Sequence, residues 1–273
     1  MVLSDADLET LAVAVRRLER PGFAGRLADL AGRPAGLIAR ALPGPAAAVI
    51  AKAAERALER ALEVAVLSLR GRWFAAGRPG GGRVVHSALA SASGAIGGAF
   101  GLFAPALELP VSTTIMLRAI AAIARQEGED LADPRTGLAC LEVFALGGPS
   151  AATDSEGAEA GYFAVRALLA RGLAEAGTII TQRGAVGGGS ATVLPILAPI
   201  AARFGAVVSE KLAAQTVAVV GAVGGAAVNL AFIEHFQDLA RGHFAVRRLE
   251  RIYGAEVVRG EYDRLKSALP TAA

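Results

Sequence analysis

The stretch NLAFIEHFQDLARGHFAVRRLE, residues 229–250, decides the fold class. When each residue is advanced by about 100°, as in an α-helix, the large apolar side chains gather on one broad arc. Charged side chains fall on the opposite side, which is the pattern of a long helix that buries one face. The apolar arc holds Phe232, Ile233, Phe236, Leu239, Ala240, Phe244 and Val246, and the opposite side holds Glu234, Asp238, Arg241 and Arg248.

Polar residues interrupt the apolar arc of this helix. His243 lies near the middle of the arc, Asn229 and Arg247 lie close by, and Glu250 lies on the same side. A buried polar group costs free energy unless it is hydrogen-bonded or paired. We therefore expect these four side chains to meet partners inside the fold.

The remaining regular segments also have helical patterns, and the only β-like tetrapeptide is the run 178–181. The sequence predicts an all-α multi-helix bundle with two long Gly/Ala-rich apolar helices packed in the core or in a membrane. A Gly-rich linker at 77–82 separates an N-terminal helical arm, 1–76, from an apolar body, 84–267, and a second Gly-rich connection is expected over 175–192. The expected helices are 5–20 with Asp5 as its cap, 45–70, 111–127 after breaks at Pro105 and Pro110, 134–146, 156–174, two or three between 196 and 252, and 256–269.

Composition excludes several classes of protein. Hydrophobic residues make up 53% of the 273 residues and charged residues 19%, which excludes an intrinsically disordered chain. The single cysteine, Cys140, excludes an intramolecular disulfide framework and a cysteine-based zinc site. A net charge of +3 is too small to argue for nucleic acid as a partner. The N-terminus lacks a basic region followed by an apolar run, so we expect a location in the cytoplasm or at the inner face of the cytoplasmic membrane.

Two stretches without charge, 87–107 and 212–233, raise the question of a membrane. Their lengths fall within the window of roughly 17–25 residues that can span a bilayer. Glycines four residues apart, such as Gly94 and Gly98 or Gly221 and Gly225, allow two helices to approach closely. A tightly packed soluble core uses the same small residues. Buried soluble helices, a spanning hairpin and shallow insertion all remain open, and we expect some contact with a membrane.

Isolated ionisable residues in apolar surroundings are the candidate site residues. Glu108 and Glu142 are candidate acid–base groups, and His243 is a candidate base. Arg118 or Arg125 is expected to pair with Glu108 or Glu142, because an unpaired buried charge costs several kcal/mol. The other interpretation is a structural network of ion pairs that fixes helix register. The candidate binding residues are Arg118, Arg125, Asn229 and Arg247.

No metal or cofactor is predicted. The three histidines have no metal-ligand spacing, and the Gly-rich segment 184–189 lacks the Lys-Ser/Thr of a phosphate-binding loop.

An ordered set of short motifs resembles the EcsC family over residues 45–265. The resemblance implies a bacterial helical protein whose namesake is encoded beside an ABC transporter, and it transfers no catalytic residues. Several of the candidate polar positions fall inside the matching motifs. These motifs are GGAFGL (97–102), ALELPVSTTIMLR (106–118), ARQEGEDL (124–131), LEVFALGG (141–148), RFG (203–205), KLAAQ (211–215), GAVGGAAVN (221–229) and HFAVRRLERIYG (243–254).

Three functions are compatible with these observations. The leading hypothesis is a non-catalytic accessory protein that docks on or in the cytoplasmic membrane and contacts lipid or a membrane protein such as an ABC transporter. The first alternative is a hydrolase acting on lipid or peptide through a buried centre of Glu108, Glu142 and His243. The second alternative is a soluble helical module that binds a ligand.

Overall fold

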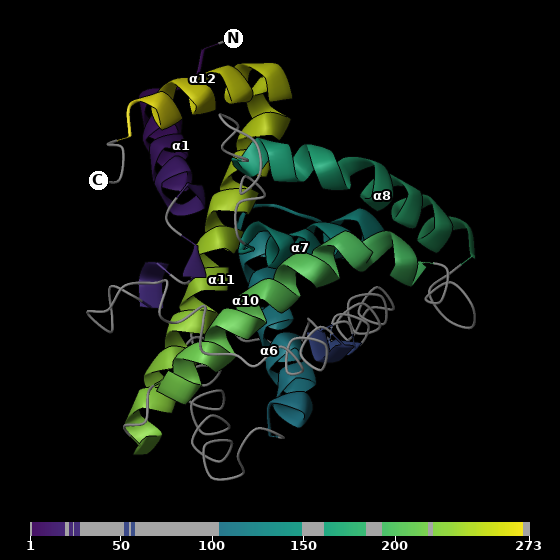
Figure 1. Cartoon of the computed structure of the whole chain (residues 1–273). Helices are drawn as coiled ribbons and strands as arrows, with labels where there is room; N and C mark the ends of the chain where they lie inside the picture. The colour runs from purple at the N-terminus through teal and green to yellow at the C-terminus, as the bar shows by residue number, and fades with distance from the viewer. Residues whose placement is uncertain are drawn as a thin grey trace, which may run out of the picture.

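The computed structural model describes residues 2–19, 22–23, 25–27, 52–54, 56–57, 104–148, 161–183, 193–217 and 221–269. Every regular element within these ranges is a helix, which confirms the predicted all-α fold (Figure 1). The named elements are α1 (Asp5–Leu18), α6 (Ala104–Gln126), α7 (Pro134–Leu146), α8 (Tyr162–Arg183), the 3₁₀ helix η2 (Leu194–Leu197), α10 (Ala198–Val217), α11 (Gly221–Tyr253) and α12 (Ala255–Ser267).

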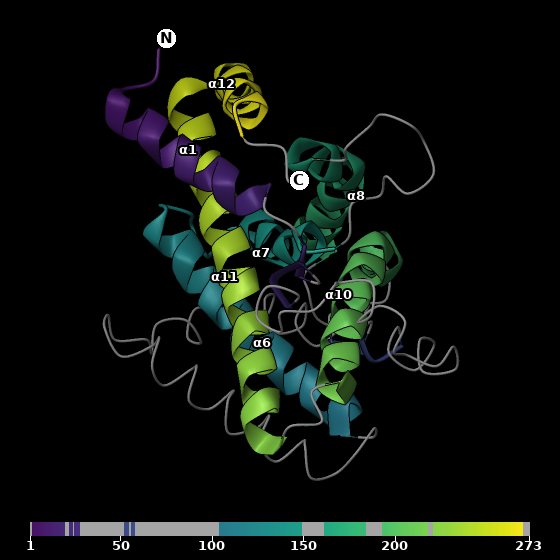
Figure 2. The same cartoon turned by 60° about the vertical axis from the view of Figure 1, so that its left-hand side comes forward.

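Helix α11 is the element around which the others pack. It contacts α1, α6, α7, α10 and α12, and it runs through both views of the molecule (Figure 2). It contains the whole of the stretch 229–250, so the long amphipathic helix predicted there is confirmed. Phe232, Phe236 and Phe244 on its apolar arc have no exposed surface.

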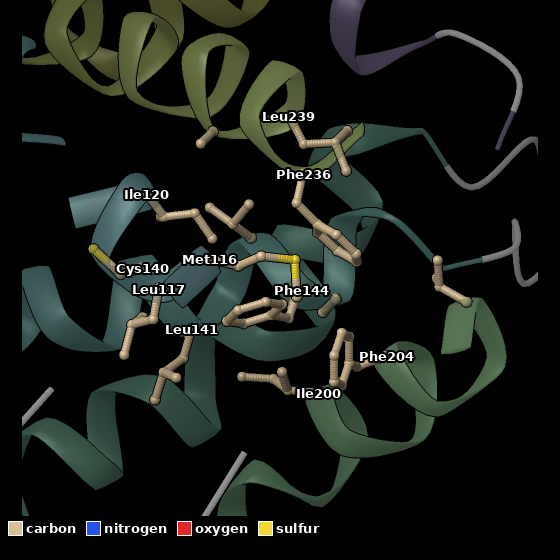
Figure 3. Packing of buried hydrophobic residues seen from close by; sticks show 14 of the residues in the cluster. Met116, Leu117, Ile120, Cys140, Leu141, Phe144, Ile200, Phe204, Phe236 and Leu239 are labelled. Atoms are coloured by element: carbon tan, nitrogen blue, oxygen red, sulfur yellow. The ribbon is translucent and has the colours of Figure 1, made fainter. Parts of the chain in front are cut away.

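The main core forms where α7 lies among α6, α8, α10 and α11. The aromatic ring of Phe144 on α7 packs against Phe204 of α10 and Phe236 of α11, with ring centroids 4.9 Å and 5.3 Å away (Figure 3). A second cluster joins α1, α12 and the C-terminal part of α11 around Leu11, Val246 and Tyr262. Helix α7 is therefore held on several sides, which makes it a rigid support for the side chains that it carries.

Both ends of α7 are fixed by side chains. At the start, the Asp133 carboxylate accepts a hydrogen bond from the Arg135 amide at 2.8 Å, and Pro134 occupies the first turn. At the end, the Arg203 guanidinium donates to the carbonyls of Ala145 and Gly148 at 2.7 Å and 3.3 Å. The predicted helix 134–146 is confirmed.

The residue that caps the N-terminus of helix α1 is one position earlier than predicted. The cap is Ser4, whose backbone is extended and whose hydroxyl accepts from the Asp7 amide at 3.2 Å. Asp5 is already helical, so the prediction of Asp5 as the cap was wrong.

Helix α8 is longer at its C-terminal end than predicted: it continues to Arg183, into the first part of the expected connection 175–192, whose remaining residues lie outside the described ranges. The hydroxyls of Thr178 and Thr181 donate to the carbonyls of Ala174 and Gly177, at 3.0 Å and 2.8 Å. Such bonds let threonine sit within a helix in spite of its branched Cβ. The tetrapeptide 178–181 is therefore helical.

Helix α6 begins at Ala104 and passes through Pro110, so the predicted break there was wrong. A proline inside a helix removes one backbone hydrogen bond and costs about 3 kcal/mol. The residues that follow bury Met116, Leu117 and Ile120 almost completely. Packing of this face against α7 and α11 outweighs the local cost.

Several sequence predictions fall on residues outside the described ranges. These are the linker 77–82, most of the helix 45–70, and the uncharged stretch 87–107 except for its last four residues, which begin α6. The stretch 212–233 is divided, because α10 ends at Val217 and α11 begins at Gly221. None of the helices in the described ranges is both long enough and apolar enough to cross a membrane.

The close approach of the α7 terminus to α10 gives a stability prediction. A Cβ at Gly148 would lie 2.9 Å from Cβ of Arg203 and 3.1 Å from its carbonyl oxygen. Because backbone must shift to accept it, we expect Gly148→Ala to lower the free energy of unfolding by about 1–3 kcal/mol. The measurement is urea denaturation followed by circular dichroism.

Gly260 on α12 provides the matched control. It is exposed, and a Cβ there would meet nothing within 4 Å. Gly260→Ala should raise stability by about 0.5–1 kcal/mol, because alanine favours the helix. Equal effects of the two substitutions would contradict the close packing described for Gly148.

Candidate functional site

A cavity of about 570 Å³ lies between α7 and α8. The α7 residues that line it are spaced three or four positions apart and so share one face of the helix: Arg135, Leu138, Ala139 and Glu142. Small-molecule sites are commonly clefts of roughly 300–1,000 Å³. The α8 wall consists of Leu173, Ala174, Gly177, Thr178, Thr181 and Gln182, and Arg247 of α11 completes the lining. We call this cavity the α7–α8 groove.

The groove has an outer end and an inner end. At the outer end Gly177 lies close to α7, since a Cβ there would be 3.6 Å from Leu138 and 3.8 Å from Arg135. Thr178, Thr181 and Gln182 are exposed at this end. At the inner end, Glu142 is only 5% exposed. The groove therefore runs from an exposed polar rim, past the apolar side chains of Leu138 and Leu173, to a buried carboxyl group.

The carboxyl group of Glu142 is poorly solvated. Burial raises its pKa to about 7, while Arg166 and Arg247 act in the opposite direction. Its nearest ionisable neighbour is His243, whose Nε2 atom lies 3.7 Å from Oε2. That distance is longer than a hydrogen bond. Within the described part of the chain the fold supplies no hydrogen bond to this carboxyl group.

His243 lies behind Glu142 and has no exposed surface. Its Nδ1 atom is 3.0 Å from the Tyr162 hydroxyl. Burial raises the pKa of Tyr162, so the phenol keeps its proton, and the hydrogen bond with Nδ1 runs in the direction that the tautomer of the imidazole sets. Burial and the charges of Arg166 and Arg247 hold the pKa of His243 well below its usual value. The imidazole is therefore neutral, and its Nε2 atom, which is buried and has no hydrogen-bond partner among the described residues, lies on the side of Glu142.

Two ion pairs flank Glu142 and His243, and in each of them the guanidinium group donates two hydrogen bonds to one carboxylate. Arg166 of α8 donates to both carboxylate oxygens of Glu250, at 2.7 Å and 3.1 Å. Arg247 donates to both oxygens of Glu129, at 2.8 Å and 3.3 Å. Glu129 also accepts from Arg251, so one carboxylate faces two guanidinium groups. Burial acts to raise the pKa of Glu129, but these two arginines outweigh it and hold that pKa below its ordinary value.

The structure brings some of the predicted site residues together and separates others. Glu142, His243 and Arg247 lie at the inner end of the groove. Asn229 is buried on α11, roughly 20 Å along the helix from His243. Glu108 belongs to α6, but its side chain is outside the described part of the structure.

The prediction that Arg118 or Arg125 pairs with Glu108 or Glu142 is not tested at Glu108, whose side chain lies outside the described part of the structure, and no ion pair of Glu142 with either arginine is found among the described side chains. Arg118 is half-buried and Arg125 is exposed, both on α6. The arginines that act on Glu142 are Arg166 and Arg247, which come from α8 and α11. Spacing along α6 gave no information on which helix would lie against Glu142.

The sequence interpretation missed Tyr162, Arg166 and Glu129. Tyr162 and Arg166 are four residues apart, and the guanidinium carbon lies 5.3 Å from the ring centroid. That spacing on a predicted helix is a usable signal for a pair that shares a face. Glu129 lies in the short connection between α6 and α7, where no periodicity applies.

In the ranges that the structure describes, no three His, Cys, Asp or Glu side chains form a group that could hold a metal ion. Cys140 is buried, and burial raises the pKa of its thiol to about 12. A thiol with that pKa stays protonated and is a poor nucleophile.

Comparison with known proteins gives one match. The model of the EcsC protein family matches residues 83–249, which include α6, α7, α8, η2, α10 and most of α11. No curated protein and no solved structure matches the chain. The matched region contains all the residues that line the α7–α8 groove.

The buried carboxyl group predicts a pH-dependent stability. Its pKa is about 7 in the folded chain against 4.5 ordinarily, so its contribution to stability is fully present below 4.5 and is lost as the pH rises through 7. Glu142→Gln removes this titration. We expect the stability of the wild type relative to the variant to fall by about 3 kcal/mol between these two pH values.

The measurement is the free energy of unfolding of both proteins from about pH 4.5 to pH 8. His235 and His243, whose pKa values are lowered by burial, destabilise the fold at low pH in both proteins, so their effects largely cancel in the difference. A difference that does not change with pH would show that Glu142 is not buried as described.

Proposed function

The chain belongs to the EcsC protein family, and we propose that it is a small-molecule-binding protein whose ligand lies in the α7–α8 groove. The observation that carries this proposal is the state of Glu142. The two neighbouring ion pairs are closed by paired hydrogen bonds, whereas the Glu142 carboxyl group, within the described residues, has an imidazole at 3.7 Å and no hydrogen bond.

This difference favours a binding role over a purely structural one. A buried polar group that stabilises a fold is normally hydrogen-bonded, because an unsatisfied one costs about 1–3 kcal/mol. The Glu142 carboxyl group receives no hydrogen bond from the described residues, and it lines the cavity at its inner end. A ligand that entered the groove would satisfy it.

The lining indicates a ligand with a polar head and an apolar body. Leu138, Ala139, Leu173 and Ala174 form the apolar middle of the groove. Glu142 and Arg247 lie at the inner end, where they can contact a polar head group. Sites for organic ligands commonly combine an apolar lining with a few placed polar groups.

The other two hypotheses from the sequence, a hydrolase and a membrane-docking accessory protein linked to a transporter, stay predictions. His243 has no exposed surface and does not line the groove. It lies behind Glu142 and would not touch a molecule bound in the groove. For this reason the geometry favours binding over hydrolysis with His243 as the base.

A probe with an apolar body and an acidic head tests the groove directly. We expect anilinonaphthalene sulfonate to bind the native protein saturably, with one site per chain, measured by fluorescence and by calorimetry. Gly177→Met places a long side chain between α8 and α7, where the nearest atoms belong to Leu138 and Arg135. It should weaken binding of the probe by about tenfold or more, since filling the cavity removes the apolar contact area.

The control is Ala164→Met, which adds the same side chain to α8 at an exposed position that does not line the groove. Its affinity for the probe should equal that of the wild type. Both variants must show a native circular dichroism spectrum and a cooperative melting transition. Equal binding by both variants, or no saturable binding by the wild type, would refute the groove as a ligand site.

A further inference from the structure

We propose that the ligand of the α7–α8 groove is a monocarboxylate with an apolar chain, whose carboxylate lies between the Arg247 guanidinium and the Glu142 carboxyl group. This inference rests on the proposed function and assigns a chemical class to the ligand. It follows from the charges at the inner end of the groove, from the hydrogen bonds left open there, and from the length of the apolar middle.

The ion pairs that reach the inner end are Arg166–Glu250 and the trio of Glu129, Arg247 and Arg251, and these five side chains together carry one net positive charge. Arg166 and Glu250 neutralise each other. Glu129 is shared by Arg247 and Arg251, so these three side chains together carry one net positive charge. Arg247 is the member of this trio that lines the groove. A head group with a single negative charge complements the surplus, whereas an ammonium head group would face it with like charge.

The hydrogen bonds that remain available also fit a carboxylate. Glu129 occupies the Nε and Nη2 atoms of Arg247, and no protein partner is described for Nη1. A protonated Glu142 is a hydrogen-bond donor, and a carboxylate is an acceptor at both oxygens. One carboxylate can therefore accept from Arg247 and from Glu142 together. An alcohol can accept from one of them but carries no charge.

The geometry also limits the size of the ligand. From Arg135 at the outer end to Glu142 at the inner end, the α7 wall covers roughly 10 Å, at 1.5 Å per residue. With C–C bonds of about 1.5 Å, an extended chain of about eight carbons covers a similar length. The apolar side chains of Leu138 and Leu173 would lie beside this chain, and the exposed rim of Thr181 and Gln182 would lie beyond its end.

Binding of a carboxylate beside Glu142 must depend on pH. Several ionisable groups surround Glu142: Arg135 on its own helix, Tyr162 and Arg166 on α8, and His243, Arg247 and Glu250 on α11. Glu142, with a pKa of about 7, changes charge near neutral pH, whereas Tyr162, Arg166 and Arg247 stay protonated and His243 stays neutral. Once Glu142 ionises, two carboxylates face each other and the affinity falls.

The test is displacement of anilinonaphthalene sulfonate from the full chain by four probes with the same tail: octanoate, octanol, octylamine and octyl phosphate. At about pH 6, where most of the Glu142 carboxyl group is protonated, we expect octanoate to bind at least about tenfold more tightly than the other three. Between about pH 6 and pH 8.5 its affinity should fall by about tenfold or more. Calorimetry at both pH values measures the affinity without the dye.

Glu142→Gln separates the assigned contact from a general preference for anions. Glutamine keeps a donor at the same place and does not titrate, so the variant should bind octanoate with an affinity that no longer changes between these pH values. Ala164→Met, which leaves the groove lining intact, should keep the wild-type pH dependence.

The outcomes distinguish this inference from the proposed function. If the dye binds the groove but octanoate is no better than octanol, or octylamine or octyl phosphate is better, the assigned class is wrong while the groove remains a ligand site. The same conclusion follows if Glu142→Gln shows the wild-type pH dependence. If the dye does not bind, or if Gly177→Met does not weaken its binding, the proposed function itself fails.

Discussion

The structure depends on how the charges buried beside α11 are compensated. Removing an ion from water costs several kcal/mol unless other groups replace its hydration. Arg166 and Arg247 are each partly withdrawn from solvent, and each is paired with a carboxylate from another element, Glu250 of α11 and Glu129 of the α6–α7 connection. These pairs connect α8 and the end of α6 to the same helix. The apolar packing brings the helices together, and the pairs fix their register.

Helix α7 is the element on which this arrangement converges. Its apolar residues, with Phe144 at the centre, pack against α10 and α11, and Arg203 binds its terminal carbonyls. A helix held in this way cannot move Glu142 away from the inner end of the groove. The carboxyl group is therefore neutralised by a raised pKa rather than by relocation into water. Rigidity of α7 and the unusual protonation of Glu142 have the same physical origin.

Helical periodicity was sufficient to predict which face of a helix is buried, but it was insufficient to predict which helices pack against each other. The arc of α11 correctly placed His243 in the interior, and the predicted helix 134–146 has the bounds of α7. The same method left open whether an arginine of α6 pairs with Glu108 or with Glu142, and it did not identify Arg166 and Arg247, because a helical wheel does not show which neighbouring helix lies opposite a residue. The extension of α8 was missed for a related reason. Threonine and glycine are typical of loops, and the sequence does not show that the threonine hydroxyls will donate to carbonyls of the preceding helical turn.

The contrast between Glu142 and Glu250 separates structure from function in this network. Both are carboxylates on the interior side of their helices, and both lie near Arg166. Glu250 accepts both hydrogen bonds from that guanidinium, which joins α8 to α11. Glu142 is left with an uncharged imidazole and the cavity. A network selected only to hold helices together would gain from closing this last contact as well, because the open carboxyl group lowers stability at neutral pH. A binding site requires this loss of stability, because the hydrogen bonds of Glu142 must remain available until the ligand binds.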